Sequence, residues 1–148
     1  PIMKELLYLK DDQLKDLIEK LFIGYRETFS DSKKILNKYS IGVAHHKVIH
    51  LISSYEGISI SDLLRKLKVT KQSLNRVLRD LIKSKMIKQI KDENDTRKKN
   101  LYLNKEGKLF FDAVYNAQKK RIFNALKNSN SDSVVKFKEV LKRIIDGK

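Results

Sequence analysis

The sequence predicts a mainly helical fold with one small β-hairpin, arranged as a winged helix-turn-helix between long N- and C-terminal helices. Only one proline and five glycines interrupt the 148 residues, which favours long helices. Apolar residues recur every three or four positions through most of the chain, as in amphipathic helices. Residues 86–103 instead alternate on both sides of a polar run, which is typical of two short strands.

The first predicted element is a long helix from about Asp12 to Tyr39, with Asp11 or Asp12 as its N-cap. At about 1.5 Å per residue such a helix exceeds about 35 Å and needs a surface to lie against. One stripe along it is apolar and consists of Leu14, Leu17, Ile18, Leu21, Phe22, Tyr25 and Phe29.

Three shorter helices are predicted next. The first spans about Val43–Tyr55 and ends before Gly57, the second follows Ser59 as N-cap, and the third runs from the N-cap Thr70 to about Ser84. The residues expected to face the core in the first two are Ala44, Val48, Leu51 and Ile52, then Leu63, Leu64 and Leu67.

The rest of the chain is predicted to form a hairpin followed by two helices. The strands are predicted at Met86–Lys91 and Asn100–Leu103, with a charged tip at Asp92–Lys98 between them. Asn104 is placed to cap a helix that reaches about Leu126. A last helix ends near Ile145 and has an apolar face of Val134, Phe137, Val140, Leu141, Ile144 and Ile145.

The helix predicted after Thr70 has two chemically different sides. At 100° per residue Leu74, Val77, Leu78, Leu81 and Ile82 share one side, whereas Gln72, Arg76, Arg79 and Lys83 share the other, flanked by Ser73 and Asn75. Arginine can bind guanine through two hydrogen bonds, and glutamine or asparagine can do so with adenine. Such a face is often only a solvated surface. Its place between a short helix and a hairpin favours DNA recognition.

Positive charge is concentrated in the same region. The whole chain has a net charge of +15, and residues 65–99 contain 13 basic and 4 acidic residues, a net charge of +9. Such a field favours anionic partners, either nucleic acid or an acidic membrane surface. The turn and hairpin signals in this segment are not those of one continuous amphipathic helix, so DNA is the expected partner and a membrane is not.

The sequence lacks the signals that are typical of several other classes of protein. There is no cysteine and no stretch of about 20 apolar residues, and the first residues lack the apolar region and cleavage site of a signal peptide. We therefore expect a cytoplasmic protein without a thiolate metal site. No Ser-His-Asp context, phosphate-binding loop or HExxH motif occurs, and we predict no enzyme, no catalytic residues and no cofactor. His46 and His50 have a spacing that could hold a metal, but no third ligand is evident. We therefore predict no metal site, with His46 and His50 on a polar face and His45 in the core.

Residues 58–107 resemble the MarR family of bacterial regulators. Five segments carry the resemblance in order: Ile60-Ser61-Asp62-Leu63-Leu64, Val69-Thr70-Lys71-Gln72-Ser73, Leu81-Ile82-Lys83-Ser84-Lys85-Met86-Ile87, Asp95-Thr96-Arg97-Lys98-Lys99 and Leu103-Asn104-Lys105-Glu106-Gly107. Two departures are Lys85, where the family pattern has glycine, and Asn104, where it has threonine. Asparagine caps helices as well as threonine does, whereas Lys85 leaves a left-handed turn at that position open.

The resemblance implies a homodimer in which residues 1–40 and 105–148 form a helical dimerisation region and residues 41–104 form the DNA-binding domain. It also implies that the helix after Thr70 enters the major groove and that Arg97, oriented by Asp95, enters the minor groove. The apolar residues expected to be shared across the dimer are Leu6, Leu7, Leu14, Leu17, Leu21, Phe123, Phe137, Leu141 and Ile144. Two-fold symmetry would match a palindromic operator.

The expected function is therefore sequence-specific regulation of transcription, as a repressor released by a small aromatic or anionic effector. The alternative is a sequence-neutral architectural DNA-binding protein. The predicted DNA contacts are Ser59, Thr70, Lys71, Gln72, Ser73, Asn75, Arg76, Arg79, Lys83, Asp95, Arg97, Lys98 and Lys99. By the same resemblance, the predicted effector-site residues are Tyr25, Phe29, Tyr39, His46 and His50.

Overall fold

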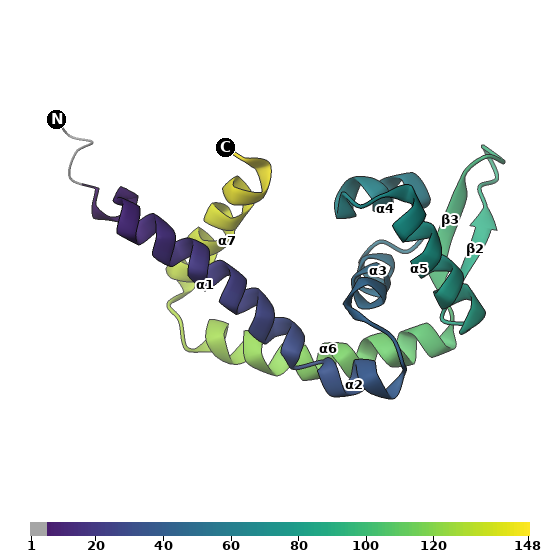
Figure 1. Ribbon diagram of the computed structural model, residues 1–148, viewed down its shortest axis with the longest axis horizontal. Coiled ribbons are helices and arrows are strands. Elements are labelled where there is room, and N and C mark those ends of the chain that lie inside the picture. Colours follow the sequence, from purple (N-terminus) through teal and green to yellow (C-terminus); the bar gives the residue numbers. More distant parts are fainter. Residues whose placement is uncertain (1–5) are drawn as a thin grey trace. The chain divides into compact units, whose positions relative to one another are not determined.

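The computed structural model describes residues 6–148 and confirms a mainly helical fold with a small antiparallel sheet (Figure 1). A 3₁₀ turn at Leu7–Leu9 precedes the first helix. The elements are α1 (Asp11–Ser30), α2 (Lys33–Lys38), α3 (Val43–Ser54), β1 (Ile58–Ser59), α4 (Ile60–Leu67), α5 (Lys71–Lys83), β2 (Ile87–Lys91), β3 (Lys99–Leu103), α6 (Lys105–Lys127) and α7 (Ser131–Asp146). Within residues 6–148, none of the helices has the length and apolar character that a membrane span requires.

The chain divides into two compact units. A helical unit combines residues 6–31 with Ala117–Lys148, and a winged unit comprises Ser32–Asn116. The predicted boundaries at 40/41 and 104/105 differ from this division. They differ because α2 and the first half of α6 belong to the winged unit, where Leu36, Phe110 and Val114 are core residues.

The prediction of a single helix from Asp12 to Tyr39 is wrong, because α1 ends at Ser30 and α2 starts at Lys33. Near the break, the Thr28 hydroxyl donates to the Gly24 carbonyl (2.8 Å) and the Ser30 hydroxyl to the Glu27 carbonyl (2.9 Å). Such side chains compete with regular helical hydrogen bonding and weaken a helix end. At the other end of α1 the N-cap position is occupied by Lys10, not by Asp11 or Asp12. Both aspartates lie in the first turn, where their charge favours the positive helix end.

The core of the winged unit forms where α3, α4, α5 and α6 pack with the small sheet. Buried apolar residues come from all of them: Val48, Ile49, Ile52, Leu63, Leu74, Leu78, Leu81, Met86, Ile87, Leu101, Leu103, Phe110 and Val114. Two expectations for this core were wrong, because Ala44 is exposed and Ile82 remains 37% exposed. The buried face of α3 also includes His46 and Ile49, since α3 packs against both α5 and β3 and so buries a wider face than one stripe.

The sheet has three antiparallel strands in the order β1-β3-β2. The predicted hairpin is confirmed as β2 and β3, with Ile87 opposite Leu103 and Lys91 opposite Lys99. The additional strand, β1, pairs Ile58 with Leu101. Two residues are too few to show alternation, and β1 therefore has no sequence signal of its own.

A left-handed residue joins α5 to β2. Lys85 has φ 62°, and the Met86 amide donates to the Leu81 carbonyl at 2.9 Å, as in a Schellman motif. The left-handed turn that the sequence left open is thus formed with lysine in place of glycine. A lysine Cβ in this conformation costs about 1–2 kcal/mol. Replacing lysine by glycine would recover only part of this cost, because glycine loses more conformational freedom on folding.

We therefore expect Lys85→Gly to raise the free energy of unfolding by about 0.5–1 kcal/mol. Urea denaturation at equilibrium measures this. Ser84→Gly is the matched control, because Ser84 has φ −79° and gains nothing from glycine. An equal gain in both variants would show that the φ angle of Lys85 is not the source of strain.

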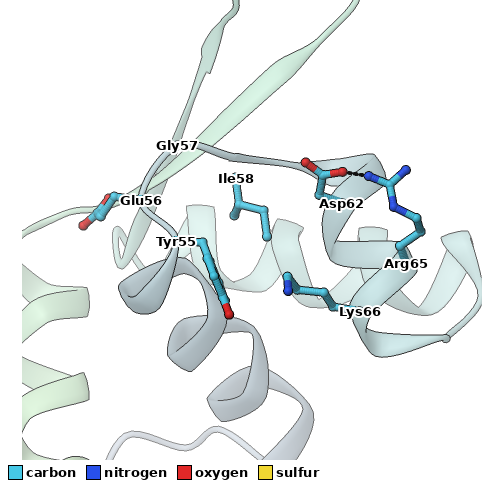
Figure 2. A pocket seen from close by; sticks show the side chains of 7 residues that line it. All are labelled: Tyr55, Glu56, Gly57, Ile58, Asp62, Arg65 and Lys66. Carbon is cyan, nitrogen blue, oxygen red and sulfur yellow. Dashed lines mark ion pairs between the residues drawn. The ribbon is translucent and has the colours of Figure 1, made fainter. Parts of the chain in front are cut away.

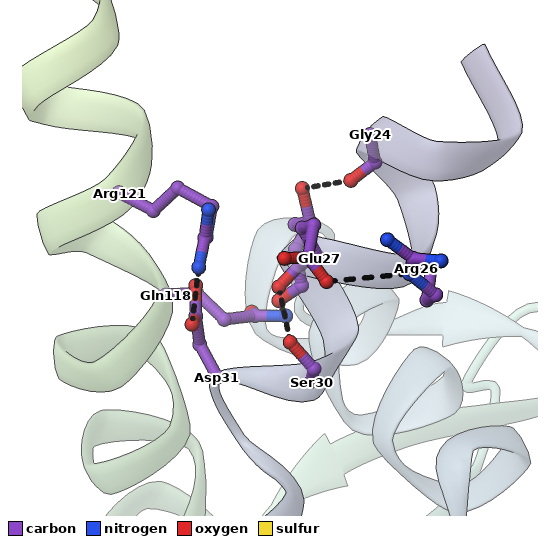
Figure 3. A network of polar contacts seen from close by, with 8 residues as sticks. Gly24, Arg26, Glu27, Ser30, Asp31, Gln118 and Arg121 are labelled. Carbon is purple, nitrogen blue, oxygen red and sulfur yellow. Dashed lines mark hydrogen bonds and ion pairs between the residues drawn. The ribbon is translucent and has the colours of Figure 1, made fainter. Parts of the chain in front are cut away.

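In the helical unit, α1 and α6 are connected by a bidentate ion pair (Figure 3). Arg121 donates from Nε and Nη2 to the two carboxylate oxygens of Asp31, at 2.6 and 3.0 Å. The Gln118 side chain adds a hydrogen bond to the Thr28 carbonyl at 3.0 Å. The hydrogen bond from Arg121 lowers the pKa of the Asp31 carboxyl below its ordinary value, against the opposing effect of burial.

Candidate nucleic-acid interface

Helix α5 begins at a well-formed cap. The Thr70 hydroxyl oxygen accepts a hydrogen bond from the Ser73 amide at 3.1 Å, and the Thr70 hydroxyl donates to the Ser73 hydroxyl at 2.9 Å. The capped first turn positions Lys71 and Gln72 on the exposed surface. Backbone amides at such a helix end are suited to binding a phosphate.

The two sides of α5 separate as the sequence predicts, with the exception of Ile82. Leu74, Leu78 and Leu81 are buried, and Val77 is half-buried. The predicted contact residues on this side of α5 are all exposed: Gln72, Ser73, Asn75, Arg76, Arg79 and Lys83. Because packing against α3 and β2 fixes the buried side, the polar side presents a continuous row of hydrogen-bonding groups.

The β2–β3 hairpin is the wing, and the loop at its tip holds Arg97 against Asp95. One carboxylate oxygen of Asp95 accepts from the Arg97 amide at 3.1 Å and from Arg97 Nε at 3.4 Å. The predicted pairing of Asp95 with Arg97 is therefore confirmed, while the Arg97 side chain stays 91% exposed. An exposed pair contributes little stability, so its main consequence is the orientation of the guanidinium group.

A groove of about 420 Å³ connects the wing with both helices of the helix-turn-helix. Its lining residues are Ser59, Ile60, Ser61, Leu64, Lys71, Asn75, Arg97, Lys98 and Lys99. Lys71, Lys98 and Lys99 take part in no ion pair within residues 6–148. The groove therefore combines unneutralised cations from α5 and from the wing, an arrangement suited to a polyanion.

Ser59 lines this groove and also serves as the N-cap of α4. It is 5% exposed, and its hydroxyl oxygen caps α4 by accepting from the Asp62 amide at 3.1 Å. Its contact with DNA stays a prediction. The α4 residues Ile60, Ser61 and Leu64 were not predicted as groove wall, although the N-cap signal at Ser59 marks where that wall begins.

Two of the three histidines of α3, His45 and His46, do not lie as predicted. His46, expected on a polar face, is 2% exposed and packs near Phe110, with ring centroids 6.4 Å apart. His45, expected in the core, is half-buried and its Nε2 lies 3.0 Å from a carboxylate oxygen of Asp80 on α5. His50 is exposed. Burial, followed by the charges of His50 and Lys47, lowers the pKa of His46 to about 4.

The predicted effector-site residues fall in both units. Tyr25 and Phe29 lie on α1, with ring centroids 4.7 Å apart. In the winged unit Tyr39 and His46 contact Phe110, and the His50 ring lies 5.7 Å from Phe111. His46 is buried in the core of the winged unit, and its part in an effector site stays a prediction. The α6 aromatics Phe110 and Phe111, which these rings contact, were not among the predicted residues.

A second hollow, of about 530 Å³, lies where the end of α3 and β1 meet α4 (Figure 2). Lys66 Nζ lies 4.3 Å from the centroid of the Tyr55 ring, and Arg65 pairs with Asp62. The cations in this hollow are already partnered by groups from the same hollow. It is therefore less suited to an anionic ligand than the groove between α5 and the wing.

Comparisons with known proteins agree with this geometry. The family model described as MarR family matches residues 39–98. The HTH-type transcriptional regulator PetP of Rhodobacter capsulatus is 36% identical over 141 residues, which cover 95% of this chain and 85% of PetP.

Two solved structures share the fold. A point mutant of MepR from S. aureus, bound to an oligodeoxyribonucleotide, aligns with a TM-score of 0.60 and 19% identity over 88% of this chain and 96% of MepR. NadR in complex with 4-hydroxyphenylacetate aligns with a TM-score of 0.74 and 20% identity over 84% of this chain and 88% of NadR. On the family match and the similarity to PetP, the chain belongs to the MarR family of transcription regulators, with a winged-helix fold.

Proposed function

We propose that this protein is a homodimeric repressor that binds a palindromic operator in double-stranded DNA and is released by a small aromatic or anionic effector. The observation that carries the DNA-binding part is the groove in which Lys71 and Asn75 of α5 meet Arg97, Lys98 and Lys99 of the wing. A helix and a hairpin presenting cations on one surface can contact a major groove and the neighbouring minor groove together.

The side chains of α5 support recognition of base sequence in addition to phosphate binding. Arg76 and Arg79 are exposed on the same side as Gln72, and each can form two hydrogen bonds to one base edge. Arg97 on the wing is suited to the minor groove, which distinguishes A·T from G·C pairs but hardly A·T from T·A. The two elements would therefore read different features of one half-site.

Assembly as a homodimer is supported by the apolar surface of the helical unit. Large apolar side chains there are between 42% and 77% exposed: Leu7, Tyr8, Leu9, Leu14, Leu17, Ile18, Phe22, Tyr25, Ile122, Phe123, Val135, Phe137, Val140, Ile144 and Ile145. Of the residues predicted to be shared, Leu6, Leu21 and Leu141 are already half-buried within one subunit. A surface this apolar is typical of a protein–protein interface, and a second copy would bury it symmetrically.

Two of the structural neighbours support the choice of partners. MepR was solved with an oligodeoxyribonucleotide and NadR with 4-hydroxyphenylacetate, a small aromatic anion. An effector of that class would suit the aromatic character of the predicted residues in each unit, which are Tyr25 and Phe29 on α1 and, in the winged unit, Tyr39, His46 and His50.

The test is to select bound sequences from random duplexes with wild type, Arg76→Ala, Arg79→Ala and Arg97→Ala at one fixed salt concentration. Losing a bidentate base contact on α5 should cost about 1–3 kcal/mol and relax the preference at one position of each half-site. Arg97→Ala should weaken binding and reduce an A·T preference at the flanks only. Asp95→Ala should have the same effect more weakly, because Arg97 loses its orienting partner.

The salt concentration is kept fixed because the logarithm of the binding constant falls by about 0.9 per log unit of salt for each phosphate that the protein neutralises.

Light scattering on the same samples should give a mass of about twice 17.3 kDa, the mass of one chain. If all three arginine variants lose affinity equally on every sequence, the protein is the sequence-neutral architectural DNA-binding protein. A monomer at micromolar concentration would contradict the homodimer.

A further inference from the structure

Helix α5 contains one acidic residue, and it lies beside the row of exposed arginines. Asp80 is four residues after Arg76 and three before Lys83, and at 100° per residue it lies about 40° from Arg76 around the helix axis. Side chains at these spacings are neighbours on a helix surface and pair when their charges are opposite. The Asp80 side chain is 55% exposed and could therefore turn toward either cation.

The structure instead shows Asp80 bound to another helix. His45 Nε2 of α3 lies 3.0 Å from a carboxylate oxygen of Asp80, and the Gly42 amide donates to His45 Nδ1 at 3.4 Å. Since a carboxylate only accepts and Nδ1 already accepts, the proton is on Nε2 and is donated to Asp80. The two ring nitrogens of His45 thus serve both neighbours, with Nε2 as donor to Asp80 and Nδ1 as acceptor from Gly42. Its side chain is only 19% exposed, which limits its alternatives.

We propose that His45 is a positioning residue for DNA recognition, because it holds the Asp80 carboxylate away from Arg76 and Lys83. Within residues 6–148 neither Arg76 nor Lys83 is in an ion pair, so both are available to bind DNA. Without His45 the carboxylate would be free to pair with Arg76 within α5, on the surface that is proposed to meet DNA. This inference rests on the proposed binding of DNA by α5.

The expected effect of losing His45 is moderate and specific. An exposed ion pair between Arg76 and Asp80 would be worth a fraction of a kcal/mol, which corresponds to an affinity loss of about threefold per subunit. For a dimer that engages two half-sites the loss becomes about tenfold. It should be concentrated at the base position whose preference Arg76→Ala relaxes.

The experiment compares the operator affinity of wild type, His45→Ala, Asp80→Ala and the double variant. Asp112→Ala, which removes an acid on α6 that lies outside the groove, is the charge-matched control. We expect His45→Ala to bind about tenfold more weakly, Asp80→Ala to bind at least as well as wild type, and the double variant to match Asp80→Ala. Asp112→Ala should show how much of any gain comes from net charge alone.

Thermal unfolding of the same variants separates this role from simple bracing of α5. Both single variants break the same hydrogen bond and should lose similar, small amounts of stability, whereas only His45→Ala should lose DNA affinity. If Asp80→Ala weakens binding as much as His45→Ala, the bond acts as a brace and the proposal is wrong. If His45→Ala binds like wild type, the proposal is also wrong. If wild type itself binds no duplex, the proposed function fails instead.

Discussion

Replacement of Gly107 by alanine is expected to lower the free energy of unfolding by about 3 kcal/mol, although alanine is the better helix former. A Cβ at this position would lie 2.1 Å from the Met86 carbonyl oxygen and 3.0 Å from the Met86 carbonyl carbon. Both are backbone atoms, so no side chain can turn aside. Forcing extra volume into a packed interior typically costs about 1–3 kcal/mol, and here the cost should lie at the upper end.

The contact is difficult to relax because α6 is attached to the same turn. The Asn104 amide donates to the Met86 carbonyl at 2.9 Å, and the Asn104 side chain donates to the Lys85 carbonyl at 3.2 Å. Moving α6 away from Met86 would lengthen both hydrogen bonds. The close approach therefore requires glycine at position 107.

Gly24→Ala is the matched control for this prediction. Gly24 lies within α1, and nothing lies within 4 Å of a Cβ built there. Alanine should therefore stabilise that helix by up to about 1 kcal/mol. Equilibrium unfolding in urea measures both variants. If Gly107→Ala proved as stabilising as Gly24→Ala, α6 would not approach the turn before β2 as closely as the structure shows.

Features set by local chemistry were predictable from the sequence. The N-caps Ser59 and Thr70 fix where α4 and α5 begin, because a hydroxyl accepting from an amide two or three residues later acts within one turn. The exposed row of α5 follows from a period of about 3.6 residues. The pairing of Asp95 with Arg97 needs only two residues of separation, and the family resemblance supplied it.

Features that depend on contacts between distant segments were not predictable. The break after α1 leaves the apolar period almost undisturbed, so only the packing of Leu36 into the winged unit reveals it. Strand β1 forms only through its antiparallel pairing with β3, which lies more than 40 residues later in the chain. The exchange of roles between His45 and His46 depends on where α5 and α6 lie, since one side of α3 meets Asp80 and the other meets Phe110.

The burial of His46 carries the second large expected effect, which is a loss of stability in mild acid. Its pKa is about 4 in the folded protein against an ordinary value of 6.5, because burial and the charges of His50 and Lys47 disfavour the imidazolium. Between these two values the unfolded chain binds a proton at His46 and the folded chain does not. Stability from this group is therefore fully present above pH 6.5 and is lost as the pH falls toward 4.

At about 1.36 kcal/mol per pKa unit, we expect His46 to lower the free energy of unfolding by up to about 3 kcal/mol between pH 7 and 4. The lowered pKa of Asp31 acts in a lower pH range, since its stabilisation is lost only as the pH falls below the ordinary carboxyl value of 3.8. Urea unfolding from about pH 7.5 to 4.5 should give a much flatter curve for His46→Gln, whatever its stability at pH 7. His50→Gln, at an exposed position on the same helix, should retain most of the steep dependence. If His46→Gln and wild type lose stability in parallel across this range, the buried imidazole is not the group that makes the winged unit sensitive to acid.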